Sequence, residues 1–149
     1  MKSRGSEVTG MKVQTTRFGE LEVEKERIIA FPVGIPGFSE ARQFFLVEHG
    51  NSIWWLQAAD DPDLAFIVTE PFSLFPDFAF KLNDDIEAML QIDDPQSLVV
   101  MAILSIDPSG ACVNLRAPIV INSAKLLGAQ VLTDDEKHSF RTPLPKLQQ

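Results

Sequence analysis

Short apolar segments separated by turn-forming residues are the feature that most restricts the fold of this chain. Leu98–Ile106 is the most apolar segment, and Asp107-Pro108-Ser109-Gly110 follows it as a strong turn signal. Six further strands are predicted at Arg27–Phe31, Phe44–Glu48, Ile53–Ala58, Leu64–Thr69, Ala111–Arg116 and Gln130–Thr133. Because helical periodicity is rare, we predict a single all-β domain, either a barrel or a sandwich.

Local signals also predict a hairpin, a short helix and the domain boundaries. Lys12–Arg17 and Glu20–Glu24 alternate apolar and polar residues around Phe18-Gly19, which is typical of a β-hairpin. Asn83 or Asp84 can cap a short helix in which Ile86, Met89 and Leu90 have helical spacing. The predicted boundaries are a disordered leader at 1–10, the β domain at 11–133 and a flexible tail at 134–149.

Two prolines mark changes of direction in the backbone. Pro118 has no N–H for a strand ladder, whereas Ile119–Ile121 is β-branched, so a strand is predicted to break at Pro118 and then continue. Pro36-Gly37 favours a type II turn in which Gly37 has a positive φ.

The negative charge is concentrated in the centre of the chain. The whole chain carries a net charge of −8, but Gln43–Leu115 contains twelve acidic residues and one basic residue, Lys81, and so has a net charge of −11. Such a region repels a phosphate backbone, so we predict no direct binding of nucleic acid. Two interpretations of the excess remain, attraction of a basic protein partner and simple surface solubility.

Motifs for catalysis or metal binding are weak. Asp60-Asp61-Pro62-Asp63 places three carboxylates in four residues, but turn residues around a proline explain this pattern better than a calcium loop does. His49 and His138 have no spacing to a nucleophile and an acid that suggests a triad. We therefore predict a non-enzymatic protein without catalytic residues, cofactor or metal. A small β-barrel hydrolase that uses Asp60 or Asp61 is the alternative.

The expected location is the cytoplasm. No apolar run approaches the roughly 18 residues that span a bilayer, and the first residues lack the apolar core of a signal peptide. Cys112 is the single cysteine, so an internal disulfide is excluded, and its apolar neighbours indicate a buried side chain.

The segment Pro71–Phe80 is rich in aromatic residues, and Pro71–Phe78 has a poor period for either a helix or a strand. We predict that an irregular loop presents part of it to a protein partner, because aromatic side chains anchor interfaces. The predicted partner-binding residues are Glu70, Phe72, Phe75, Asp77 and Phe78. The alternative interpretation, which we favour for most of these rings, is packing in the core.

Several short motifs occur along the chain in a specific order and spacing. They are Gly34-Ile35-Pro36-Gly37-Phe38, Leu56-Gln57 before the acidic turn, Ala65-Phe66-Ile67-Val68, Pro71-Phe72, Pro76-Asp77-Phe78 and residues 114–122. Together they resemble the FliW family of flagellar assembly factors, from about Lys12 to about Leu132. Phe78 departs from the pattern, because similar proteins commonly have a tyrosine there.

The resemblance implies a fold and a function. The implied fold is all-β, of mixed barrel and sandwich character, and the local signals described above predict one or two short helices in it. The implied function is non-enzymatic: the protein binds newly made flagellin in the cytoplasm and, once released, binds the RNA-binding translational regulator CsrA. That binding stops CsrA from repressing flagellin synthesis. Asn114, Pro118 and Asn122 are interpreted as determinants of the fold rather than as contact residues.

Overall fold

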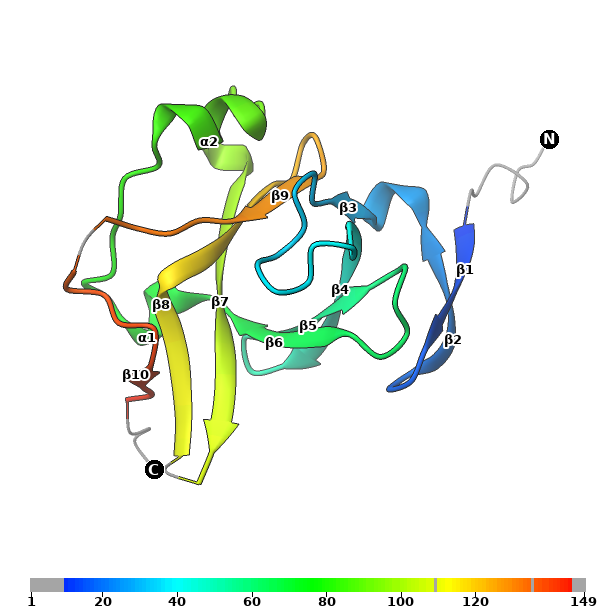
Figure 1. Ribbon diagram of the computed structural model, residues 1–149, viewed down its shortest axis with the longest axis horizontal. Coiled ribbons are helices and arrows are strands. Elements are labelled where there is room, and N and C mark those ends of the chain that lie inside the picture. Colours follow the sequence, from blue (N-terminus) through cyan, green and yellow to red (C-terminus); the bar gives the residue numbers. More distant parts are fainter. Residues whose placement is uncertain (1–9, 109, 135, 146–149) are drawn as a thin grey trace.

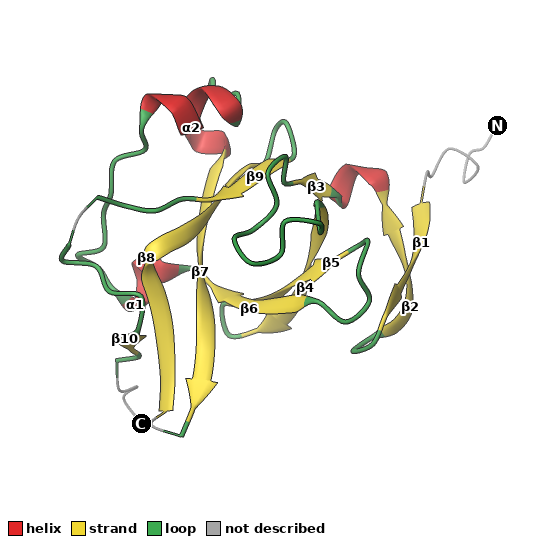
Figure 2. Ribbon diagram, viewed as in Figure 1, coloured by secondary structure: helices red, strands yellow, loops and turns green. Residues whose placement is uncertain are grey.

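The computed structural model describes residues 10–108, 110–134 and 136–145. Its strands are β1 (Gly10–Thr15), β2 (Gly19–Glu24), β3 (Ile29–Ala30), β4 (Gln43–Gly50), β5 (Ile53–Ala58), β6 (Ala65–Thr69), β7 (Leu98–Asp107), β8 (Gly110–Asn122), β9 (Leu127–Gln130) and β10 (Thr142–Pro143). The described residues also form helices α1 (Pro71–Leu74) and α2 (Asp84–Met89), with 3₁₀ turns at Lys25–Arg27 and Pro95–Ser97. The predicted all-β class with one or two short helices is confirmed (Figure 2).

Most strands belong to one sheet with the order β10-β8-β7-β6-β5-β4-β3-β9. β9 pairs a second time with β8, over Leu127–Gln130, whereas it meets β3 at the single pair Ala30 and Leu127. The sheet therefore curves back toward its own beginning and is barrel-like (Figure 1). The predicted barrel or sandwich character is confirmed in this form.

The main core fills the inside of the curved sheet. Phe31, Phe44, Leu56, Val68 and Ile119 are all fully buried there, at 0% exposure. The rings of Phe31 and Phe44 lie 4.9 Å apart, centre to centre, in an edge-to-face arrangement. These side chains come from β4, β5, β6, β8 and the segment after β3, so the core joins strands that are distant in the sequence.

The β1–β2 hairpin forms a separate layer outside the sheet. Its paired strands run antiparallel from Gly10 opposite Glu24 to Thr15 opposite Gly19, as the alternating pattern predicted. Val13 and Val23 of the hairpin pack on Phe45 of β4, and all three are buried. In Figure 1 the hairpin lies to one side of the sheet, beyond β4 and β5.

Both predicted changes of direction are present, but the strand break predicted at Pro118 is wrong. β8 runs through Pro118 without a break in the strand, but residues 115–118 lie opposite Ala102 alone, because Ile103 pairs with Asn114 and Met101 with Ile119. The expected corner is thus a large bulge within one bent strand (Figure 1). At the other site, Gly37 has φ +88° and Phe38 N–H donates to the Ile35 carbonyl at 2.7 Å, as the predicted type II turn requires.

The ends of the chain differ in part from the expectation. Of the leader predicted at 1–10, only Gly10 lies within the described residues, and it begins β1. Part of the segment predicted as a flexible tail packs on the domain: Thr142–Pro143 pairs with β8, and the Ser139 carbonyl accepts bonds from the N–H groups of Leu115 and Arg116. Sequence pattern did not show this, because the strand partner of β10 lies far away in the chain.

Candidate protein-binding surface

Glu70 organises the start of the aromatic segment. Its carboxylate accepts hydrogen bonds from the N–H groups of Phe72 (2.6 Å) and Ser73 (3.1 Å), and from the Ser73 hydroxyl (2.6 Å). Pro71 occupies the first position of α1, where its missing N–H carries no cost. The segment predicted to be an irregular loop therefore begins as a capped helical turn. Glu70 has a structural role here, in addition to any effect of its charge.

The three phenylalanines predicted for partner binding lie at different depths. Phe72 is 44% exposed, Phe75 is half-buried, and Phe78 is 4% exposed. Phe78 packs among Val100, Ala102, Val113 and Leu115, so the structure places it in the core rather than on the predicted surface. Phe72 covers it from outside, with 5.4 Å between the ring centres. Phe72 is thus the aromatic side chain of this segment that is most available to a partner.

The aromatic segment forms one wall of a groove of about 630 Å³, and the other wall comes from β8 and the tail. We call it the aromatic groove; its lining residues are Phe75, Asp77, Phe78, Ala79, Leu115, Lys137, His138 and Thr142. His138 is nearly buried, with its Nε2 2.7 Å from the Ala79 carbonyl and its ring 4.8 Å from that of Phe78. Sequence reasoning missed Lys137 and His138, since nothing in a polar tail indicates that it folds back onto Phe78.

The acidic turn after β5 is held by hydrogen bonds between side chains and backbone groups. Asp60 accepts a bond from Arg42 N–H at 3.0 Å, and Asp61 accepts one from Asp63 N–H at 3.1 Å. The Gln57 amide nitrogen lies 3.0–3.4 Å from four carbonyls in and beside the turn. These bonds are those of a structured turn. In the described part of the chain, no three His, Cys, Asp or Glu side chains are placed to hold a metal ion.

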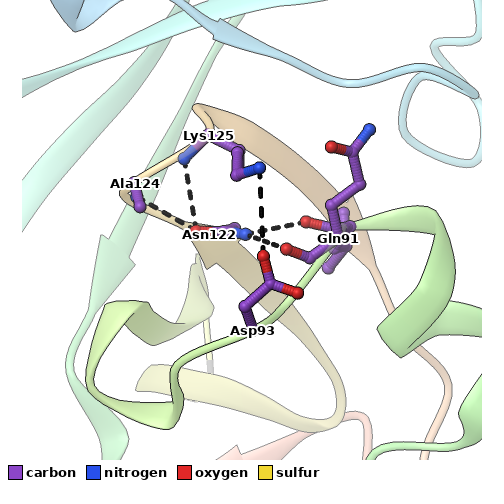
Figure 3. A network of polar contacts seen from close by, with 6 residues as sticks. Gln91, Asp93, Asn122, Ala124 and Lys125 are labelled. Carbon is purple, nitrogen blue, oxygen red and sulfur yellow. Dashed lines mark hydrogen bonds and ion pairs between the residues drawn. The ribbon is translucent and has the colours of Figure 1, made fainter.

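Asn122 ties three parts of the fold together (Figure 3). Its side-chain N–H groups donate to the carbonyls of Leu90 (2.8 Å) and Gln91 (3.0 Å) at the end of α2. Its side-chain oxygen accepts bonds from the N–H groups of Ala124 (3.0 Å) and Lys125 (3.3 Å) in the β8–β9 turn. The side chain is 2% exposed, so its role is structural, as the sequence interpretation proposed.

Comparisons with known proteins decide the family. The model of the family described as FliW protein matches residues 12–144. The chain belongs to the FliW family. A flagellar assembly factor FliW from Caldicellulosiruptor bescii is 42% identical over 132 residues, which is 87% of each chain. A FliW from Syntrophus aciditrophicus is 41% identical over 140 residues, 91% of this chain and 89% of the relative.

A solved structure agrees with the sequence relatives. A crystal structure of the flagellar assembly factor FliW superimposes with a TM-score of 0.85 at 34% identity, and the match covers 91% of this chain and 99% of that one. The chain is thus a non-enzymatic flagellar assembly factor. The FliW match extends to residue 144, beyond Leu132, and so includes the tail residues that line the aromatic groove. No helix among the described residues is long and apolar enough to cross a membrane.

Proposed function

We propose that this protein binds flagellin in the cytoplasm and, once released from it, binds CsrA and relieves repression of flagellin synthesis. The observation that carries the proposal is the FliW match over residues 12–144, together with the FliW-like fold. We propose the aromatic groove and the exposed Phe72 beside it as part of the partner interface. An exposed ring over a buried aromatic cluster is the kind of anchor that dominates protein interfaces.

The charge distribution supports a basic partner. The stretch Gln43–Leu115 has a net charge of −11, and many of its acidic side chains are exposed, including Asp77 at the rim of the aromatic groove. An RNA-binding protein carries positive charge where it contacts phosphates. Complementary charge accelerates association with such a protein, and an acidic protein bound beside its RNA site disfavours RNA.

The decisive experiment has two stages. The purified chain is first mixed with flagellin, and the two should co-elute in gel filtration. It is then titrated into a preformed complex of CsrA with flagellin leader RNA, and a gel shift should show release of the RNA. Flagellin added in excess should restore the RNA complex, because the proposal makes the two partners mutually exclusive. The proposal would be refuted if the chain failed to bind flagellin or failed to bind CsrA.

Asp77→Lys tests the groove within this scheme. Asp77 is exposed and lines the groove, so the change should slow association with CsrA about tenfold at low salt and weaken the salt dependence of the rate. Glu40→Lys is the matched control, because Glu40 is also exposed but lines a different hollow, beside Gly37 and Leu64. Equal effects of the two substitutions would show that total charge matters and that the groove does not.

A further inference from the structure

A second groove, of about 670 Å³, lies between the β1–β2 hairpin and the sheet. We call it the edge groove. Leu21 and Val23 of β2 line it on one side, and Phe45 and Val47 of β4 line it on the other. Val23 and Phe45 are buried, whereas Leu21 and Val47 are half-buried. The groove therefore has an apolar floor that is partly open to solvent.

β4 presents an unpaired edge to this groove. In the described residues β3 pairs with β4 at Gln43 and Phe44 and at no later position, although β4 continues to Gly50. Neighbouring residues of a strand point their N–H and C=O groups to opposite edges. Ala59 N–H donates to the Gln43 carbonyl, so the odd-numbered residues of β4 face β5. The backbones of Leu46 and Glu48 consequently face the groove.

One side chain already uses this edge. The Arg27 guanidinium donates to the Leu46 carbonyl at 3.2 Å. Arg27 is exposed and is the last residue of the 3₁₀ turn that follows β2. It satisfies one acceptor in the way that natural proteins use charged side chains to protect sheet edges. A strand that entered the groove would replace this single bond with a ladder of backbone bonds.

The charges around the groove select the strand. Glu22, Glu24 and Glu48 line it and are exposed, and Arg27 is the one basic residue in its lining. A segment with apolar residues on one face and lysine or arginine on the other would meet both the apolar floor and these carboxylates. An acidic segment would be repelled by the same three groups.

We infer that the edge groove binds an extended, basic segment of a protein partner as an added strand on β4. Recognition of this kind takes its affinity from main-chain hydrogen bonds and its selectivity from alternate side chains. The inference concerns a surface other than the aromatic groove, and it holds whether or not flagellin or CsrA supplies the segment.

A labelled octapeptide of alternating lysine and valine is the probe. Binding is measured by fluorescence anisotropy, and the amide resonances of Leu46 and Glu48 are followed by NMR. We expect saturable binding that shifts both amides and protects them from hydrogen exchange. The octapeptide of alternating glutamate and valine should not bind. Absence of lysine-valine binding, or shifts confined to other parts of the protein, would overturn the inference.

A matched pair of variants isolates the backbone contact. Glu48→Thr and Glu48→Pro remove the same charge, but only proline also removes the N–H that faces the groove. We expect Glu48→Pro to bind the peptide about fivefold to tenfold more weakly than Glu48→Thr. Arg27→Ala should strengthen binding of the peptide, because it removes the side chain that is hydrogen-bonded to the Leu46 carbonyl. Equal affinities of the two Glu48 variants for the peptide would contradict strand addition. If Glu48→Pro does not fold, the NMR measurement on the unaltered protein decides whether the peptide adds as a strand.

Discussion

Replacing Asn122 with alanine should destabilise this protein far more than replacing an exposed asparagine. The change removes four hydrogen bonds, to Leu90, Gln91, Ala124 and Lys125, from a side chain that is 2% exposed. A hydrogen bond contributes about 0.5–1.5 kcal/mol net, and a buried group left without a partner costs about 1–3 kcal/mol. We expect the free energy of unfolding to fall by about 3–5 kcal/mol, since the bond to Lys125 is long and the turn is near solvent.

The backbone around Asn122 adds to this expectation. Gln91 and Leu126 are non-glycine residues with positive φ, at +54° and +58°. The first accepts a bond from the Asn122 side chain, and the second donates its N–H to the Asn122 carbonyl at 2.8 Å. Such conformations persist only where surrounding contacts hold them. Loss of the side chain should therefore accelerate amide exchange at the end of α2 and in the β8–β9 turn before the rest of the domain opens.

Asn83→Ala is the control for this prediction. Asn83 is exposed and caps α2 through one bond, from Ile86 N–H at 2.8 Å, so its loss should cost about 1 kcal/mol. Urea denaturation of both variants gives the two free energies of unfolding by linear extrapolation. A difference of less than about 1 kcal/mol between the variants would refute the reasoning, because the network in Figure 3 would then contribute no more than a surface cap.

Three further predictions follow from the turns, the charge and the rings. Gly37→Val should lower the free energy of unfolding by about 1–2 kcal/mol through backbone strain alone, since no atom lies near the added Cβ. Gly34→Ala should lower it by about 2–4 kcal/mol, because a Cβ there would lie 2.7 Å from Ser39 Cα. Melting curves of the two variants compare these effects. A gel shift of flagellin leader RNA with this protein alone should show no complex at physiological salt, because of the central charge of −11. Phe72→Ala should weaken partner binding by about 1–3 kcal/mol with little loss of stability. Phe75 packs against the Phe78 cluster, so Phe75→Ala should instead lower the melting temperature. The reverse result would exchange the roles of the two rings.

Elements with local signals could be predicted from the sequence. The strand predicted at Ile53–Ala58 has the same first and last residues as β5. The hairpin, the Asn83 cap and the Gly37 turn also lie where their residues predicted them. In each case neighbouring residues determine the structure, through alternation, a capping side chain or a required φ. The strand predicted at Gln130–Thr133 is instead Leu127–Gln130, because pairing with β8 sets its bounds.

Features that depend on long-range contact could not be predicted. The burial of each phenylalanine in Pro71–Phe80 is set by the packing of the segment on β7, β8 and the tail. The sequence alone does not distinguish the buried rings from the exposed ones. The edge groove depends on where β3 ends relative to β4, which is a property of pairing rather than of either segment. The closest sequence signal for that groove was the run of glutamates that alternates with Leu21 and Val23.

The acidic residues of this chain have two kinds of role, and the difference decides how charge can be tested. Glu70, Asp60 and Asp94 accept backbone hydrogen bonds that shape α1, the turn after β5 and the turn before β7. Reversing the charge of Glu70 would therefore remove a helix cap as well as a carboxylate, and a fall in partner affinity could come from either. Asp77 is exposed and makes no contact of this kind among the described interactions, so its reversal changes the field at the aromatic groove and leaves the local backbone as it is. If electrostatic attraction brings a basic regulator to this protein, Asp77→Lys must slow its association while the melting temperature stays within about 2 °C of the parent value, which corresponds to a stability change of at most about 1 kcal/mol.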